Sequence, residues 1–414
     1  MTHFSIFANA KTKSYEKQNS SIFSFIFLGM LTAFGPFVTD MYLPTLPEMT
    51  NWFDTTSSLV QLSLTTSMIG LATGQLIFGP LSDKHGRRPL LLAGMFLFLT
   101  ATIGCIFSQN ITQFIGWRLV QGIAGSSGIV ISRSVATDKY SGRELAKMMG
   151  IIGAINGVAP VAAPIGGGLL AESIGWTGIF WCLFIIGCLL LAGSLHFNES
   201  LPASQRKQTN WSGLFLSFGT VLRNRRYATY VLLFSFCHIV LFANIASAPF
   251  IMQQHYGFSA MQFSICFGIN AMAIVFASAW SMKFRHLEIV AFRGSQCMIV
   301  FSLLLLVALD NSCCFWIYEI LLLCLLVTLG LTFTAANTLA MDAERKSAGT
   351  ASALLGALGF TFGGIVPPLV GIGNVMLSTG IIFVAGASGA LLCAHHAFKS
   401  MANRRRQICK SQLS

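Results

Sequence analysis

The chain has 414 residues, of which 54% are hydrophobic and only 10% are charged, and its formal net charge is +12. A soluble globular domain carries about 25% charged residues, so this composition excludes a protein that is surrounded by water. A helix that spans a bilayer needs roughly 20 mainly apolar residues. The long apolar runs therefore predict an all-α membrane protein.

The apolar runs, taken in chain order, predict twelve transmembrane helices. We expect these helices at residues 22–46, 59–81, 90–108, 111–137, 146–170, 175–196, 227–252, 262–283, 291–310, 315–341, 348–371 and 376–398. The longest polar interruption follows the sixth run and divides the chain into two six-helix halves. The predicted organisation is a tail at 1–21, a bundle at 22–196, a central loop at 197–226, a second bundle at 227–398 and a basic tail at 399–414.

The basic residues predict the orientation of these helices. If successive helices alternate in direction, every Lys and Arg except Arg118 and Arg133 falls on the side that holds both termini. The positive-inside rule then predicts that both termini are cytoplasmic, in the inner membrane. The net positive charge follows from this topology, so we expect anionic lipid headgroups as the partner of the basic loops, and no nucleic acid.

The two halves also resemble each other. Asp138 and Asp342, Pro164 and Pro368, and Asp40 and Asn244 are separated by the same offset along the chain. This pattern favours two parallel repeats, which is typical of transporters whose halves rock around a central site. The 11 cysteines show no metal-ligand spacing, and we expect neither a metal nor a cofactor.

The end of the first run contains an acid, in "FGPFVTDMYLPTLP". Asp40 follows a long apolar stretch and is the acid expected at depth, whereas Asp310 and Glu319 lie at predicted helix ends, where a solvated acid is expected. A sheltered carboxyl group near a cation can load and release a proton. Phe37 and Tyr42 flank Asp40 and are candidates for an aromatic substrate surface. The alternatives are a solvated Asp40 at a helix end and ordinary packing of the two rings.

The loop after the second run, "FGPLSDKHGRRP", is highly charged for such an apolar chain. Its candidate functional residues are Gly79, Asp83, Gly86, Arg87 and Arg88. Gly86 permits a tight turn, and Asp83 can accept hydrogen bonds from the arginines. The alternative is an ordinary positively charged cytoplasmic loop.

The fourth run contains an arginine, in "IGWRLVQGIAGSSG". An unpaired Arg118 costs at least ~3 kcal/mol at the bilayer centre, so we expect it to face protein or a wet cavity. The alternative is that Arg118 reaches the outer interface. Arg133 lies near the inner end of this run, where we expect it to extend toward the headgroups. His238 and Asn244, in the seventh run, either line a cavity or bond between helices.

The fifth run, "GIIGAINGVAPVAAPIGGG", combines small residues with two prolines. Its candidate residues are Gly153, Gly157, Pro160, Pro164 and Gly167. Glycines at this spacing let helices approach closely, and prolines kink a helix. The alternative to a functional role is a plain packing interface.

Several of these motifs resemble one family. The loop G-x-L-S-D-x-x-G-R-R is similar to the signature loop of the major facilitator superfamily, and R-x-x-Q-G is similar to the family's fourth-helix motif. "DMYLPTLP" resembles the first helix of the bicyclomycin-resistance and chloramphenicol-efflux (Bcr/CflA) branch of twelve-helix drug/proton antiporters. The fifth run resembles the antiporter motif, although Ala159 stands where that motif has glycine.

The resemblance implies the major facilitator fold and roles for particular residues. Asp83 with Arg87 and Arg88 would form an inner gate latch, and Arg118 would take part in proton coupling. With Asp40 as the proton carrier, we expect a monomeric exporter of amphipathic drugs that exchanges them for protons. The chain has no G-x-x-x-x-G-K-[ST] loop, and we expect no catalytic residue or enzyme activity. The alternative is a proton-coupled or facilitated transporter of a small metabolite.

Overall fold

The computed structural model describes residues 26–140, 142–206, 218–344 and 348–413, and within them every regular element is helical. Helices are the expected solution in lipid, because each backbone donor and acceptor finds a partner inside its own segment. In this part of the chain, 11 helices are long and apolar enough to cross a membrane. They are residues 26–52, α3 (Ser57–His85), α4 (Arg87–Ile106), α5 (Ile111–Lys139), α6 (Gly142–His196), α8 (Arg225–Phe250), α9 (Ala260–Ser281), α10 (Leu287–Asp310), α11 (Phe315–Ala343), α12 (Ala348–Val370) and α13 (Val375–Leu413).

The long helix α6 consists of two helical segments that could each cross the membrane. Its backbone reverses at Gly175, where φ is 62°, a conformation that glycine adopts without the steric penalty of a Cβ atom. The predicted fifth and sixth runs meet at this position. With α6 divided at this turn, the described helices supply twelve candidate crossings, the number that the apolar runs predict.

The first helix differs from the prediction because it is interrupted. Residues 26–40 are helical, a turn follows, and the chain continues as the short 3₁₀ helix η1 (Leu43–Thr45) and as α2 (Leu46–Trp52). A proline lies at the start of each short helix, where its missing N–H group would have no intrahelical partner in any case. Asp40 is the last residue before this break, so the break fixes its position within the first crossing.

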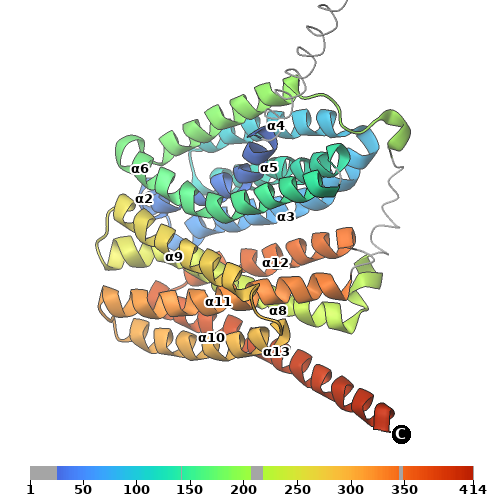
Figure 1. Cartoon of the computed structure of the whole chain (residues 1–414). Helices are drawn as coiled ribbons and strands as arrows, with labels where there is room; N and C mark the ends of the chain where they lie inside the picture. Colours follow the sequence, from blue (N-terminus) through green and yellow to red (C-terminus); the bar gives the residue numbers. More distant parts are fainter. Residues whose placement is uncertain (1–25, 141, 207–217, 345–347, 414) are drawn as a thin grey trace, which may run out of the picture.

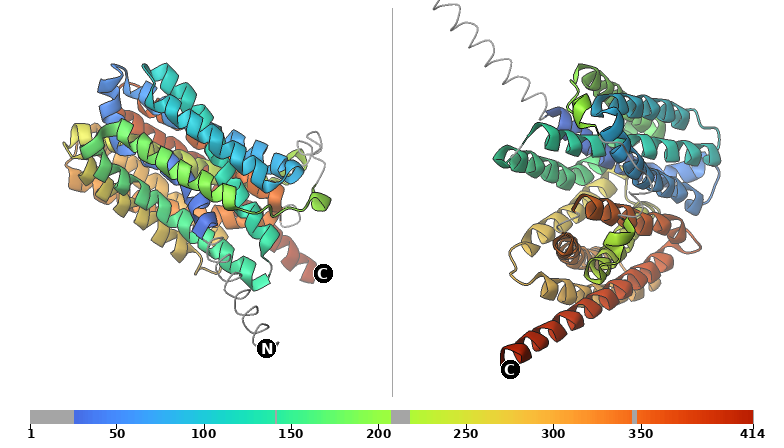
Figure 2. Two further views of the ribbon diagram at one scale, coloured as in Figure 1. Left: turned by 90° about the horizontal axis from the view of Figure 1, so that it is seen from above. Right: turned by 90° about the vertical axis from the view of Figure 1, so that its right-hand side faces the viewer.

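The helices lie in two groups, which Figure 1 and the right-hand view of Figure 2 show one above the other. The N-terminal group contains residues 26–52 and α3 to α6, and the C-terminal group contains α8 to α13. The groups meet where α3 packs against α12 and where α6 packs against α9. The repeat relation between the halves and the exact domain boundaries stay predictions.

Charge distinguishes the two ends of the helix bundle. At one end of the bundle α3 and α5 finish and α4 and α8 begin. We call this end the basic face, because it holds Lys84, Arg87, Arg88, Lys139 and Arg226. The segment that follows α6 lies at this end, on the right in Figure 1. The other end, which contains the turn at Gly175 and the short helix α2, is the opposite face.

Candidate functional site

A cavity of about 500 Å³ lies between the two helix groups. Its wall on the C-terminal group is mainly apolar and includes Leu241, Phe242, Ile245, Phe267, Ile274 and Phe360. Its polar lining residues are Thr39, Asp40, Gln75, Arg133, Asn244, Asn337 and Ser352. Drug-sized ligands occupy sites of this kind, in which apolar walls provide contact area and a few polar groups fix orientation.

Asp40 is the only acid in this lining and is 8% exposed. The break in the first helix places its side chain at the cavity wall. In the described part of the chain, no Lys, Arg or His lies within ion-pair distance of its carboxyl group. Asp40 is therefore not a solvated acid at the outer rim, and its carboxyl group is available to a proton or to a cationic ligand.

Arg118 of α5 is completely buried, with 0% exposure, and lies beside the same break. Two of its guanidinium nitrogens each donate to the backbone carbonyl of Val38 at 3.1 Å. Carbonyls near the end of a helix lack intrahelical partners, and a cation there also interacts favourably with the helix dipole. Arg118 thus holds the end of the first helix, two residues before Asp40.

Two further contacts fix the Arg118 guanidinium. It donates to Gln121 Oε1, and Gln121 in turn donates to the hydroxyl of Thr102 at 2.8 Å. The Tyr42 ring lies 4.3 Å from the guanidinium carbon, a distance typical of a cation–π contact. Arg118 therefore faces protein, as expected, but its hydrogen bonds go to Val38 and Gln121 and not to the carboxylate of Asp40.

The small residues of α6 allow this close packing around the break. A Cβ atom on Gly167 would collide with the carbonyl oxygen of Met41, the residue that follows Asp40. Pro164 is buried and Pro160 lines the cavity. Gly153 and Gly157 are helical, and their surroundings lie outside the described residues.

The residues predicted for the substrate surface separate into two sets. Asn244 is 2% exposed, lines the cavity and has an unpaired Oδ1 atom. Tyr42 is turned toward Arg118, and Phe37 packs against the hydrophobic core. His238 lies behind the wall, where its Nδ1 atom is 3.0 Å from the Phe234 carbonyl oxygen.

Arg133 is a lining residue that the sequence did not identify. We expected this side chain to extend toward the headgroups, but it lies in the cavity wall and is exposed. Its distance along α5 from Arg118 is several helical turns toward the basic face. An exposed side chain at this level indicates that the cavity opens toward the basic face.

The opposite face is closed by hydrogen bonds between the two helix groups. Ser58 Oγ donates to the Pro368 carbonyl at 2.8 Å, and Gln253 Nε2 donates to the Pro44 carbonyl at 2.8 Å. The backbone N–H of Met261 also donates to Glu172, at 3.3 Å. The structure therefore shows a central cavity that is shut at the opposite face.

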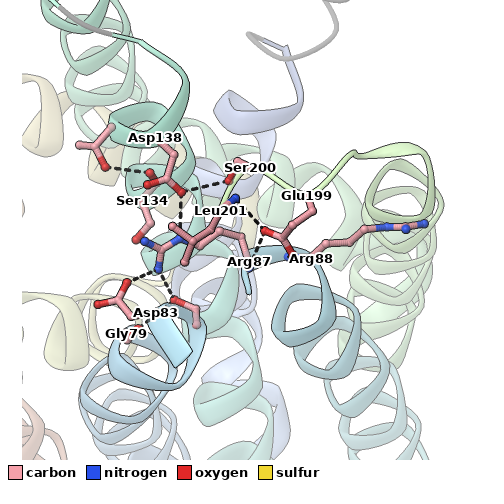
Figure 3. A network of polar contacts seen from close by, with 11 residues as sticks. Gly79, Asp83, Arg87, Arg88, Ser134, Asp138, Glu199, Ser200 and Leu201 are labelled. Atoms are coloured by element: carbon pink, nitrogen blue, oxygen red, sulfur yellow. Dashed lines mark hydrogen bonds and ion pairs between the residues drawn. The ribbon is translucent and has the colours of Figure 1, made fainter. Parts of the chain in front are cut away.

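The signature loop between α3 and α4 forms a charged network at the basic face (Figure 3). Gly86 makes the turn with φ at 102°. The Arg87 guanidinium binds two acids: Asp83 in the last turn of α3, and Asp138 at the end of α5. The distance between Arg87 Nε and Asp138 Oδ2 is 3.0 Å. The network joins α3, α4 and α5 within one helix group. Gly79 lies in α3, where an added Cβ would touch only Val130.

The segment after α6 completes this network and was not identified from the sequence. Glu199 accepts hydrogen bonds from the backbone N–H groups of Arg87 at 2.9 Å and Arg88 at 3.1 Å. The Arg88 side chain donates to the Leu195 carbonyl at 2.7 Å, and Ser200 donates to Asp138 at 3.0 Å. The sequence offered one signal for Glu199. It is an acid in the predicted central loop, on the same predicted side of the membrane as Arg87 and Arg88 of the signature loop.

Known proteins agree with this architecture. The family described as "Major Facilitator Superfamily" matches residues 25–368. The chain belongs to the major facilitator superfamily. It is 38% identical to an uncharacterized MFS-type transporter, YdgK, of Bacillus subtilis (strain 168), over 88% of this chain and 92% of that protein. The family and this relative identify the chain as a multi-pass membrane transporter and not an enzyme.

Other relatives confirm the resemblance to the Bcr/CflA branch. A bicyclomycin resistance protein homolog of Haemophilus influenzae is 29% identical over 89% of this chain and 94% of that protein. A chloramphenicol resistance protein of Pseudomonas aeruginosa is 32% identical over 58% of this chain and 56% of that protein.

Solved structures share the fold. The D-xylose–proton symporter superposes with a TM-score of 0.73 at 14% identity, over 91% of this chain and 97% of that chain. A bacterial homologue of the human lysosomal transporter Spinster, in an inward-facing and unoccupied conformation, has a TM-score of 0.68 at 15% identity, over 91% of this chain and 97% of that chain.

Proposed function

We propose that this transporter exports amphipathic, drug-like molecules across the cytoplasmic membrane in exchange for protons. The observation that carries the proposal is Asp40, a buried carboxyl group without an ion-pair partner in the described residues, in the wall of a cavity with a broad apolar surface. A proton and a cationic or polar substrate group would compete for this carboxylate. Relatives named for bicyclomycin and chloramphenicol resistance support drugs as the substrate class.

Alternating access would couple the two events. In the state described above, the cavity is closed at the opposite face, and substrate enters from the basic face. The groups then rock, the hydrogen bonds at Ser58 and Gln253 break, and a proton from outside displaces the substrate from Asp40. A charge that crosses ~100 mV supplies about 2.3 kcal/mol, which sustains roughly a 50-fold drug gradient.

The orientation is part of the proposal. The basic face, with both termini, would face the cytoplasm, because positive residues are retained on that side, and its Lys and Arg side chains would contact anionic headgroups. The chain would act as a monomer, since the cavity is built by its own two helix groups. Fusion of a fluorescent reporter and of alkaline phosphatase to the C-terminus tests this orientation, and periplasmic phosphatase activity would contradict it.

The decisive experiment compares wild type with Asp40→Asn. Each is expressed in a pump-deficient host and assayed for chloramphenicol resistance, and everted vesicles are used to follow chloramphenicol uptake together with proton release. We expect wild type to accumulate the drug and to release protons, and Asp40→Asn to do neither while still binding chloramphenicol. Equal resistance in both strains would show that Asp40 is not the coupling acid. Drug uptake by wild type without proton release would contradict proton exchange.

A further inference from the structure

A second buried carboxyl group lies in the C-terminal group, away from Asp40. Glu319 is placed a little more than one turn inside α11 and is 7% exposed, although its position near a helix end predicted a solvated acid. Its Oε2 atom has no hydrogen-bond partner. In the described part of the chain, no Lys, Arg or His forms an ion pair with it.

The polar groups around Glu319 are also buried and incompletely bonded. Asn270 of α9 is 1% exposed and interacts with the Glu319 carboxyl group, but neither of its amide atoms completes a hydrogen bond of good geometry. Cys266, one turn earlier on α9, is close enough to Glu319 to interact with it electrostatically. The Tyr318 hydroxyl is unpaired, and its ring is packed against the ring of Tyr256.

This arrangement requires a proton or another small ligand. An isolated carboxylate in a low-dielectric interior is strongly disfavoured unless it is paired or neutralised. When the carboxylate takes up a proton, the new O–H group can donate to Asn270 Oδ1, and the charge disappears. When the proton leaves to water, the Asn270 amide can turn and donate to the carboxylate through its NH₂ group. The Glu319–Asn270 pair can therefore bond internally in both protonation states.

The helix that carries Asn270 connects this pair to the cavity and to the other helix group. Phe267, Ala271 and Val275 of α9 line the cavity. Two turns before Ala271, on the same face of α9, Ser264 packs directly against Gly168 of α6. A relative motion of the two groups would therefore act on α9 at this contact, and a shift of α9 against α11 would change the distance between Asn270 and Glu319.

We propose that Glu319 and Asn270 form a second proton site, which takes up and releases a proton as α9 shifts during the transport cycle. This inference rests on the proposed proton exchange and adds a proton to it. One further proton per cycle makes the exchange of a neutral drug more strongly dependent on membrane potential.

Infrared difference spectroscopy of the purified full-length protein tests the site without any transport. In the Asp40→Asn background, we expect a carboxylic C=O band that titrates with pH. The band disappears in Asp40→Asn/Glu319→Gln and is unchanged in Asp40→Asn/Asp310→Asn, since Asp310 is an exposed acid at the end of α10. Absence of a titrating band, or its survival after Glu319→Gln, overturns the proposal. Loss of the band on addition of Na⁺ at constant pH overturns it in favour of a sodium site.

A second variant covers the case in which Glu319→Gln does not fold. Asn270→Ala removes only the amide partner, and we expect the carboxylic band to shift in frequency. An unshifted band would exclude the pairing of these two side chains.

Transport then links the site to the cycle. In proteoliposomes with chloramphenicol as the probe, Glu319→Gln is expected to move one proton fewer per drug molecule than wild type and to lose part of the dependence on membrane potential. An unchanged proton-to-drug ratio would make Glu319 a static structural acid. If wild type transports no chloramphenicol, the proposed drug export fails, whereas the infrared titration still decides whether Glu319 binds a proton.

Discussion

Glu199 Oε1 accepts a hydrogen bond from the backbone N–H of Arg87 at 2.9 Å, and so ties the segment after α6 to the first residue of α4. The first N–H groups of a helix have no intrahelical acceptor, and a carboxylate at this position also interacts favourably with the helix dipole. The signature loop is therefore held by two acids of its own helix group, Asp83 and Asp138, and by one acid from the central segment.

Replacing Glu199 by alanine is expected to destabilise the basic face. The variant loses the cap of α4, and helix caps contribute about 1 kcal/mol each. We expect a lower Tm of the purified protein and reduced drug export. Glu144→Ala is the matched control, because Glu144 is an exposed acid near the start of α6 at the same face. An equal Tm for the two variants would contradict a capping role.

Arg118→Ala is expected to disrupt the end of the first helix. Removal of the guanidinium leaves the Val38 carbonyl and Gln121 Oε1 without their donor, at about 1–3 kcal/mol for each buried acceptor. We expect a lower Tm and no uphill transport, and only partial recovery in Arg118→Lys, because an ammonium group cannot reproduce the planar fork.

The control for Arg118 is Arg293→Ala, which removes an exposed arginine of α10. Chloramphenicol binding and transport are measured separately. Uphill transport that survives Arg118→Ala would refute its part in coupling.

Gly167→Ala is expected to impair transport, and its neighbour Gly166→Ala is not. A methyl group on Gly167 would collide with the Met41 carbonyl oxygen, whereas a methyl group on Gly166 would meet no atom within 4 Å. Overpacking of this kind costs about 1–3 kcal/mol and would displace the break that positions Asp40. Tm and vesicle transport report the difference, and identical behaviour of the two variants would exclude the close contact.

Gly371→Ala is expected to weaken the closure of the opposite face. A Cβ atom on Gly371 would collide with the backbone of Ser58, and overpacking of this kind costs about 1–3 kcal/mol. We expect a lower Tm, and faster reaction of an impermeant maleimide with Ser58→Cys, made in a background without the native cysteines, once Gly371→Ala is added. An unchanged labelling rate would show that this contact does not help to close the face.

Composition and hydropathy predicted the fold well, because lipid imposes long apolar helices whatever their detailed packing. The turn at Gly175 falls between two predicted runs. The break after Asp40 was missed, although Pro44 and Pro47 were visible, because hydropathy continues across it. Hydropathy measures how apolar a segment is, and does not show whether its backbone is interrupted.

The candidate site was only partly predictable, because sequence position does not show the direction in which a side chain points. Asp40 was placed at depth from the apolar stretch that precedes it. Glu319 and Arg133 were assigned to helix ends, yet Glu319 is buried against α9 and Arg133 faces the cavity. One partner of Arg118 is the Val38 carbonyl, which no side-chain pattern can reveal, whereas the other, Gln121, is part of the R-x-x-Q-G motif.

The hydrogen bonds that immobilise Arg118 have an electrical consequence for the cavity. With that guanidinium bound to Val38, the cavity lining contains two ionisable side chains. Asp40 lies at the deep end of the cavity, and Arg133 lies nearer its mouth. The Arg118 cation still acts on Asp40 through space, so an ionised Asp40 is balanced at the deep end, and the unbalanced charge of the passage lies at Arg133. A dipolar molecule should therefore keep its electron-rich end toward the entrance.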